Sequence, residues 1–336
     1  MQEEGPIPPT IEWCDGFVRL IDQRRLPDEL TFVHAETVDQ LCDAITTLAI
    51  RGAPALGAAG AMGIALAAVT GVPLDDAATK LRATRPTAVN LGWGIRRALA
   101  AADPVSEAVA VAGEDVARNR RVGANGAPLL ADGMRVLTHC NTGSLACVGY
   151  GTAVGVIRAA HEAGKDLRVW ADETRPVLQG SRLTAWELRR LGIPVTVIAD
   201  GLAGSLMASD EVDCVIVGAD RIAANGDVAN KVGTYALAVL AAHHQLPFYV
   251  AAPTSSIDQT MSSGAAIPIE RRPDDEVAMV AGQRVVPRGV EVDNRAFDVT
   301  PGGLVSAIVT DAGVAWPPFS NSLSRIGVST SDAHAH

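Results

Sequence analysis

The second half of the chain contains five short runs of apolar and β-branched residues, and each run is followed by a small polar cluster. These runs are Val136–Cys140, Leu167–Asp172, Val195–Asp200, Val215–Asp220 and Phe248–Pro253. Helix-like stretches alternate with them, which is typical of parallel strands joined by right-handed crossovers. Apolar runs of this length are expected when a strand is buried on both faces. The pattern therefore predicts a parallel sheet with helices on both faces.

The first part of the chain follows a different pattern. Asp15–Gly16 separates two short strand-like runs, Thr10–Trp13 and Phe17–Ile21, and this arrangement predicts a β-hairpin. From Thr37 to about Arg121 the apolar spacing is helical, with breaks at Gly and Pro. These features predict a hairpin followed by a helical domain.

The predicted division of the chain has three parts. Residues 1–126 form the N-terminal hairpin and helical domain, and residues 127–319 form the parallel-sheet domain, with Gly123–Pro128 as a Gly- and Pro-rich boundary. Residues 320–336 are rich in Ser, Asn, Asp and His, a composition that favours a tail without fixed structure. The expected fold class is α/β.

One segment, Ala53–Val69, is apolar enough to raise the question of a membrane span. It is dominated by Ala and Gly and carries Pro54 near its start, so a tightly packed buried helix is the better interpretation. We expect no membrane partner.

The charge balance restricts the possible ligands. The chain carries 28 Lys and Arg against 38 Asp and Glu, giving a formal net charge of −10, and no basic stripe is visible. A nucleic acid or an anionic membrane surface is therefore not an expected partner. The 5 cysteines lack paired spacing and no leader-like segment opens the chain, so we expect free thiols and a cytoplasmic protein.

Polar residues at the ends of the predicted strands indicate where the chemistry lies, because ligands of such sheets bind beyond the carboxyl ends of the strands. Cys140 follows one strand and precedes Asn141–Ser144, a plausible turn into a helix. The partial positive charge of a helix N-terminus would stabilise a thiolate at this position. The alternative is that Cys140 is a small buried apolar residue.

Asp220 stands at the end of a second strand, which should be buried on both faces. Partial desolvation there would raise its pKa and suit it to proton transfer. The alternatives are a salt bridge to Arg221 or a cap on the following turn.

Three segments carry candidate anion ligands. Arg51 lies beside Gly52 and Pro54, where one predicted helix gives way to the next, and exposed backbone N–H groups beside an arginine make a phosphate site. Arg85 precedes Pro86 in a similar arrangement, and Lys231 follows shortly after Asp220. Each of these cations would, taken alone, also fit a solvated surface position.

Several familiar signatures are missing from the sequence. It has no Gly-x-x-x-x-Gly-Lys-Ser/Thr phosphate loop, and Gly149–Gly155 departs from a dinucleotide fingerprint in the place of its last glycine. Tight backbone packing is the better interpretation of those glycines. The histidines at 139, 161, 243 and 244 lack metal-ligand spacing, so we expect no metal site and regard His139 as a packed core residue.

Nine segments of the chain form a set of motifs in a fixed order: Ile50–Gly57, Arg85–Leu91, Thr138–Gly143, Glu173–Pro176, Gln179–Thr184, Gly218–Ile222, Asn225–Asp227, Asn230–Tyr235 and Ala296–Pro301. Together they closely resemble the methylthioribose-1-phosphate isomerase family, which belongs with the α, β and δ regulatory subunits of initiation factor 2B. The resemblance extends from about Ile11 to Pro318 with the motifs in the family's order.

The resemblance implies a fold, an activity and a set of site residues. The implied fold is a helical N-terminal domain followed by a Rossmann-like domain, and the implied activity is conversion of 5-methylthioribose 1-phosphate to 5-methylthioribulose 1-phosphate in methionine salvage. Asp220 matches the family's proton donor and Cys140 its transition-state-stabilising thiol. The positions that match its substrate contacts are Arg51, Gly52, Ala53, Arg85, Gln179, Asn230 and Lys231. A homodimer is also implied, and moving hydrogen between two carbons of the sugar needs no redox cofactor, so we expect no cofactor.

Two alternatives remain open at the level of sequence. One is an isomerase that acts on 5-deoxyribose 1-phosphate or ribose 1,5-bisphosphate. The other is a non-catalytic regulatory subunit, which would be expected to lack the thiol and the carboxylate, whereas Cys140 and Asp220 are both present. Proton transfer through an enediol and a direct hydride shift are equally compatible with the residues.

Overall fold

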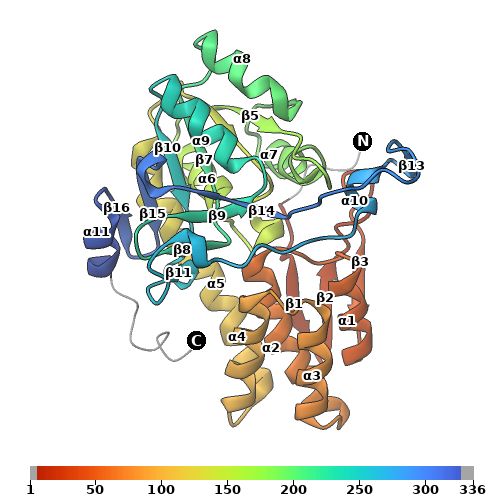
Figure 1. The fold of residues 1–336 in the computed structure, drawn as a ribbon. Coiled ribbons are helices and arrows are strands. Elements are labelled where there is room, and N and C mark those ends of the chain that lie inside the picture. The colour runs from red at the N-terminus through yellow and green to blue at the C-terminus, as the bar shows by residue number, and fades with distance from the viewer. Residues whose placement is uncertain (1–5, 327–336) are drawn as a thin grey trace.

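The computed structural model describes residues 6–326, and within this range a seven-stranded sheet forms the centre of the larger domain (Figure 1). Its strand order is β16-β15-β10-β7-β4-β5-β6. The strands are β4 (Arg135–Thr138), β5 (Arg168–Asp172), β6 (Val195–Ile198), β7 (Cys214–Val217), β10 (Phe248–Ala251), β15 (Ala307–Thr310) and β16 (Gly313–Ala315). All neighbours pair in parallel except β15 and β16. The five predicted strands and their parallel arrangement are confirmed.

Alternating side chains of the central strands face two separate cores. Cys214 and Ile216 of β7 pack into one core, whereas Val215 and Val217 pack into the other. Helices cover the two faces, as the continuous apolar pattern requires. The helices of this domain are α6 (Ala153–Glu162), α7 (Ala185–Arg190, preceded by a π turn at Gly180–Thr184), α8 (Ala203–Ala208), α9 (Thr234–His243), α10 (Asp275–Ala278) and α11 (Phe319–Ile326).

A second, four-stranded sheet stands at the carboxyl edge of the large one, and the sequence pattern did not predict it. Its order is β11-β8-β9-β14, formed by β11 (Ile257–Asp258), β8 (Arg221–Ala223), β9 (Val228–Lys231) and β14 (Phe297–Thr300). A small hairpin, β12 (Met279–Val280) with β13 (Gln283–Arg284), lies in the long connection before β14. These strands are too short to give a clear periodicity.

The N-terminal part, coloured red to yellow in Figure 1, lies below the sheet domain in that view. The predicted hairpin is confirmed as β1 (Ile11–Cys14) and β2 (Phe17–Ile21), and a third strand, β3 (Phe32–Ala35), extends it. The helices that follow are α1 (Val38–Thr46), α2 (Ala53–Thr70), α3 (Leu74–Thr84), α4 (Val89–Ala100) and α5 (Pro104–Gly126).

Helix α2 is the apolar segment that raised the membrane question. By length and composition it could cross a membrane, but 72% of its apolar window is buried inside the protein, against α4 and α5 among others. Its small residues allow this close packing. The prediction of a buried helix is confirmed.

The predicted boundary segment Gly123–Pro128 is largely helical. Helix α5 continues to Gly126, and a short 3₁₀ turn follows directly at Ala127–Leu129. A Cβ at Gly123 would lie 2.9 Å from the carbonyl oxygen of Gly155 in α6, and one at Gly126 would lie 2.6 Å from Val156. These glycines therefore serve helix packing, and α5 links the two parts of the chain. The division at residue 126 itself stays a prediction.

The predicted unstructured tail requires a correction at its start. Residues 320–326 belong to α11, because Phe319 and Leu323, one helical turn apart, are both buried against the second core. This amphipathic spacing outweighs the polar composition around it. Residues 327–336 lie outside the described part of the chain.

Packing between α2 and α4 gives a test of the fold. A Cβ at Gly94 would lie 1.9 Å from the carbonyl oxygen of Gly57, so we expect Gly94→Ala to destabilise the protein by about 3 kcal/mol or more. Gly92 on the same helix meets only the flexible end of Arg96, and Gly92→Ala should be neutral or stabilise by about 0.5–1 kcal/mol. Chemical denaturation measures both; equal effects would contradict this packing.

Candidate active site

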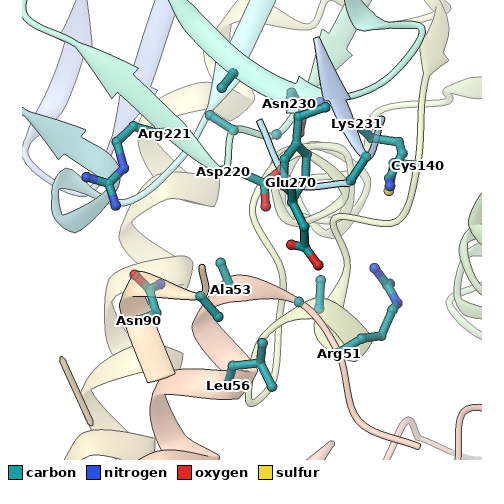
Figure 2. Close-up of a pocket in the computed structure, with 18 of the residues that line it drawn as sticks. Arg51, Ala53, Leu56, Asn90, Cys140, Asp220, Arg221, Asn230, Lys231 and Glu270 are labelled. Carbon is teal, nitrogen blue, oxygen red and sulfur yellow. The ribbon is translucent and has the colours of Figure 1, made fainter. Parts of the chain in front are cut away.

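One cavity of about 260 Å³ lies at the carboxyl edge of the large sheet, between it and the N-terminal helices (Figure 2). It is lined by all nine residues that the sequence singled out: Arg51, Gly52, Ala53, Arg85, Cys140, Gln179, Asp220, Asn230 and Lys231. They come from both parts of the chain. The thiol and the carboxyl group therefore open into the same cavity, which is the juxtaposition that the sequence hypothesis required.

Cys140 is the second residue after the end of β4 and is 8% exposed. Its backbone is left-handed, with φ of 63°. The Cys140 N–H donates to the Thr174 hydroxyl (2.8 Å), and the Thr184 hydroxyl donates to the Cys140 carbonyl (2.7 Å). Non-glycine residues rarely adopt this conformation, and these two bonds hold it in place.

The helix expected directly after Cys140 is absent from the described structure. A three-residue 3₁₀ turn stands at Ser144–Ala146, and α6 begins only at Ala153. The prediction that a helix N-terminus acts on the thiol is therefore wrong. The positive charge nearby comes instead from side chains, since Figure 2 shows Lys231 and Arg51 on the same side of the cavity as Cys140.

Asp220 lies between β7 and β8 and faces the cavity. Burial raises the pKa of its carboxyl group to about 6; the nearby cations, Lys231 first, oppose this rise, and Glu270 adds to it. The alternative of a salt bridge to its neighbour is excluded because Arg221 pairs with Asp258, at 2.6 Å between Nη1 and Oδ2. The Asp220 N–H donates to the Ala229 carbonyl (2.9 Å), which fixes the segment to β9.

The N-terminus of α2 forms one wall of the cavity. Gly52 has φ of 93°, and a Cβ there would lie 2.3 Å from the Ala146 carbonyl oxygen, so only glycine fits. Ala53 begins the helix behind it, and unpaired N–H groups at this end attract anions.

Arg51 precedes this helix start. Its Nη2 donates to the side-chain oxygen of Asn141, and its buried Nε has no hydrogen-bond partner among residues 6–326. Buried donors without a partner are rare in folded proteins, and a bound anion would satisfy this one.

Arg85 has a different environment from the one expected. Its Nη2 lies 3.0 Å from Oε2 of Glu270, so this cation is already paired, and the Thr87 hydroxyl donates to the same oxygen (3.1 Å). Burial would raise the pKa of Glu270, but Arg85, Thr87 and Arg272 outweigh it and hold that pKa below its usual value. Sequence reasoning missed Glu270 because the charged run around it resembles a solvated surface.

The remaining predicted contacts are donors on the sheet side. Lys231 has no ion pair in the described range, and its Nζ lies 5.3 Å from the ring centroid of Phe297. Asn230 is 4% exposed, and its side-chain nitrogen donates to the Thr234 hydroxyl (3.0 Å). Gln179 is 5% exposed, and its Oε1 has no partner among the described residues. The cavity thus offers both a cation and amide groups to a polar ligand.

Close to the thiol lies a buried group that the spacing of histidines did not reveal. The ligand-type atoms of His139, Asp172 and Asp200 lie within 4.8 Å of one another. Both ring nitrogens of His139 are already engaged by protein atoms, and the Asp200 oxygens accept the N–H groups of Thr174 and Arg175. We therefore interpret the group as a hydrogen-bonded cluster.

The fold and the cavity have counterparts among known proteins. The model of the initiation factor 2 subunit family matches residues 49–317. A crystal structure of translation initiation factor eIF-2B, subunit delta, from A. fulgidus superposes with a TM-score of 0.87 at 47% identity, covering 95% of this chain and 99% of that one. The chain belongs to the initiation factor 2 subunit family.

Within this family the most similar sequences carry one name. A methylthioribose-1-phosphate isomerase of Anaeromyxobacter sp. (strain K) is 57% identical over 97% of this chain and 99% of its own length. One of Pelotomaculum thermopropionicum is 51% identical over 94% of this chain and 93% of its own. The crystal structure of 5-methylthioribose 1-phosphate isomerase from Pyrococcus horikoshii OT3 has a TM-score of 0.89 at 44% identity, with 96% of each chain covered.

The raised pKa of Asp220 predicts a gain in stability on its removal. A carboxyl group with a folded pKa of about 6 against an ordinary 3.8 binds its proton more tightly in the folded state, so its ionisation destabilises the fold as pH rises through this window. At pH 7.5 we expect Asp220→Asn to raise the free energy of unfolding by about 1–3 kcal/mol while reducing turnover by orders of magnitude. Thermal unfolding and a turnover assay measure the two effects.

Asp258→Asn is the matched control for this substitution. Burial would raise the pKa of Asp258, but Thr260 and Arg221 hold it below its usual value, so its loss should lower Tm. A fall in Tm for Asp220→Asn as well would show that ionisation of Asp220 does not destabilise the fold.

Proposed function

We propose that this protein is an aldose-ketose isomerase that converts 5-methylthioribose 1-phosphate to 5-methylthioribulose 1-phosphate in methionine salvage. The observation that carries the proposal is the shared cavity, in which a carboxyl group with a pKa of about 6 and a thiol stand beside two cations without ion pairs in the described range. The names and identities of the similar isomerases support the same conclusion.

The reaction moves hydrogen from C2 to C1 of the sugar. Because the phosphate blocks the anomeric oxygen, the ring cannot open to a free aldehyde, and a proton donor to the ring oxygen is needed. Asp220 suits this role because a proton donor works best when its pKa lies near the operating pH. A buried cavity also excludes water from the opened sugar. No step of this isomerisation requires a redox cofactor.

The other residues take roles that follow from their chemistry. Arg51, with the N–H groups at Gly52 and Ala53, would bind the phosphate together with Lys231. Cys140 would stabilise the transition state beside the reacting carbons. The neutral amides of Gln179 and Asn230 would bind sugar hydroxyl groups. Arg85 would contact the substrate as part of its ion pair with Glu270.

The charge pattern favours a substrate with one phosphate. Among the cations that line the cavity, Arg85 and Arg272 pair with Glu270, and Arg221 pairs with Asp258. Arg51 and Lys231 are left for a ligand, whereas ribose 1,5-bisphosphate would require cations at two ends. The 5-deoxy sugar phosphate remains the nearer competitor because it differs only in the C5 substituent.

A non-catalytic regulatory role is the alternative from a different class, and one similar structure is named as a subunit of eIF-2B. Retention of both Cys140 and Asp220 in one cavity favours an enzyme. We also infer a cytoplasmic homodimer without a nucleic-acid or membrane partner, on the family resemblance and the net charge of −10.

Substrate preference tests the proposal directly. The purified protein should turn over 5-methylthioribose 1-phosphate with the highest kcat/KM, 5-deoxyribose 1-phosphate less well, and ribose 1,5-bisphosphate worst, since within residues 6–326 Arg51 and Lys231 are the lining cations without an ion pair and one phosphate would occupy both. Product formation can be followed by ³¹P NMR. Absence of turnover with all three sugars would favour the regulatory alternative. Carbon-bound deuterium in product formed in D₂O would indicate proton transfer; its absence would indicate a hydride shift.

The pH profile tests the role of Asp220. If its protonated form donates to the ring oxygen, kcat/KM should fall by about tenfold per pH unit above a pKa of about 6, because the donor form is lost as pH rises. Cys140→Ser should lower turnover and leave this pH dependence in place. A kcat/KM that rises through the same range would instead assign the ionised carboxylate as the active form.

A further inference from the structure

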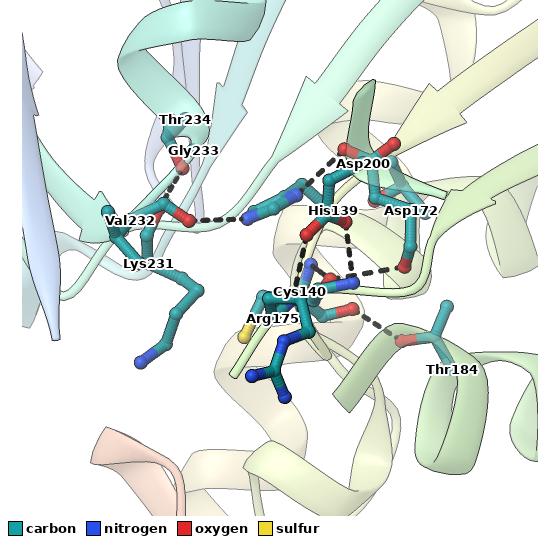
Figure 3. Close-up of polar contacts among 12 residues, drawn as sticks. His139, Cys140, Asp172, Arg175, Thr184, Asp200, Lys231, Val232, Gly233 and Thr234 are labelled. Atoms are coloured by element: carbon teal, nitrogen blue, oxygen red, sulfur yellow. Dashed lines mark hydrogen bonds and ion pairs between the residues drawn. The ribbon is translucent and has the colours of Figure 1, made fainter. Parts of the chain in front are cut away.

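The imidazole of His139 joins two segments of the site, and the roles proposed above leave it unassigned. His139 is 1% exposed and immediately precedes Cys140. Its Nδ1 lies 2.8 Å from Oδ2 of Asp172, and its Nε2 lies 2.9 Å from the carbonyl oxygen of Val232 (Figure 3). The ring therefore lies between the end of β5 in the large sheet and the end of β9 in the small one.

Through Asp172, His139 contacts the chain segment that fixes the backbone of Cys140. Thr174, two residues further on, donates its hydroxyl to the Asp172 carbonyl (3.1 Å) and accepts the N–H of Cys140 (2.8 Å). The end of β5 thus contacts both the His139 ring and the Cys140 backbone. Since Cys140 has φ of 63°, which is unfavourable for a side chain with a Cβ, the surrounding contacts must hold it in place.

Through Val232, His139 contacts the chain segment that carries Lys231. Val232 directly follows Lys231, and Gly233 next to it has φ of 107°. A Cβ at Gly233 would lie 2.9 Å from Cε1 of His139, so the ring packs directly onto this turn. Asp298 accepts the Gly233 N–H (2.7 Å) and fixes the same turn from its other side.

Both ring nitrogens of His139 face oxygen atoms. The Val232 carbonyl can only accept, so Nε2 donates to it, and the proton between Nδ1 and Oδ2 of Asp172 completes the second hydrogen bond. An amide NH₂ group is a donor of similar reach. Asn in place of His139 would put its donor near the position of Nδ1, and Gln would put its donor near the position of Nε2.

We propose that His139 is a positioning residue that sets the place of the Cys140 thiol through Asp172 and the place of the Lys231 ammonium through Val232. The inference rests on the proposed isomerase function, in which the thiol serves the reacting carbons and the ammonium serves the phosphate. One imidazole then couples two adjacent parts of the substrate site, and its two hydrogen bonds have separable consequences.

Two substitutions separate these consequences. His139→Asn keeps a donor toward Asp172 and loses the one toward Val232, so we expect KM for 5-methylthioribose 1-phosphate to rise about tenfold with kcat nearly unchanged. His139→Gln keeps a donor toward Val232 and loses the one toward Asp172, so kcat should fall about tenfold with KM nearly unchanged. Proportional changes in kcat and KM in both variants would overturn the proposal, as would wild-type kinetics in both.

Two further measurements do not depend on turnover. Calorimetric titration with inorganic phosphate reports on the Lys231 end, and the rate of Cys140 alkylation by iodoacetamide, followed by peptide mass spectrometry, reports on the thiol. His139→Asn should weaken phosphate binding about tenfold and leave the rate of alkylation unchanged. His139→Gln should leave phosphate binding unchanged and accelerate alkylation. If the wild-type protein fails to isomerise the sugar, the proposed function fails, while these two measurements still decide the role of His139.

The controls distinguish positioning from loss of the fold. His34 is exposed on β3, and its Asn and Gln variants should match the wild type in every measurement. A merely structural role for His139 would lower Tm in both His139 variants and change phosphate binding and alkylation together. That outcome would also overturn the proposal.

Discussion

The buried carboxylate of Glu187 anchors the loop on which the two parts of the molecule meet. It is 1% exposed, and it accepts hydrogen bonds from the Asn141 side chain (2.7 Å) and from the N–H (2.7 Å) and hydroxyl (2.5 Å) of Ser144. Burial raises the pKa of Glu187, and the hydrogen bonds from Ser144 and Asn141 oppose this rise, because a buried carboxyl group is costly unless it has hydrogen-bond partners. The same loop accepts the hydroxyl of Thr10 at the Ser144 carbonyl (2.7 Å) and holds Arg51 through Asn141. The N-terminal domain is thus seated against the strand end that bears the thiol.

The electrostatics of the cavity follow from this closure. Cations and carboxylates from both parts of the chain line the same partly buried cavity. Ion pairing among them therefore determines which charges are left to bind a ligand. Arg85 is paired with Glu270, whereas Arg51 donates a hydrogen bond to a neutral amide and Lys231 lies over an aromatic ring. Burial raises the pKa of Asp220 against the opposing effect of Lys231, Arg51 and Arg85. Ionisation of a carboxyl group in such a site lowers the free energy of unfolding, and favourable contacts elsewhere in the fold must offset this loss.

The family contains proteins named as isomerases and proteins named as initiation-factor subunits on closely similar folds. The fold alone therefore does not decide between these functions. Side chains at two strand ends, Cys140 and Asp220, and the cations around them are what favour catalysis for this chain. The His139 cluster adds a layer of support behind them, because strained backbone at a site persists only when neighbouring groups fix it.

Sequence patterns by themselves determined the five central strands, the hairpin and the buried helix α2, because burial on both faces and glycine-bounded helix starts leave strong local patterns. The full set of nine expected cavity residues came from the family resemblance. Only the tertiary structure decided the pairing of charges and the support of the thiol. Glu270 lies 185 positions from Arg85, and Val232 lies 93 positions from His139. Such contacts have no local periodicity, since they arise from two sheets and two domains meeting in space. The short strands of the second sheet, the continuity of α5 and the start of α11 were decided in the same way, by packing against distant partners.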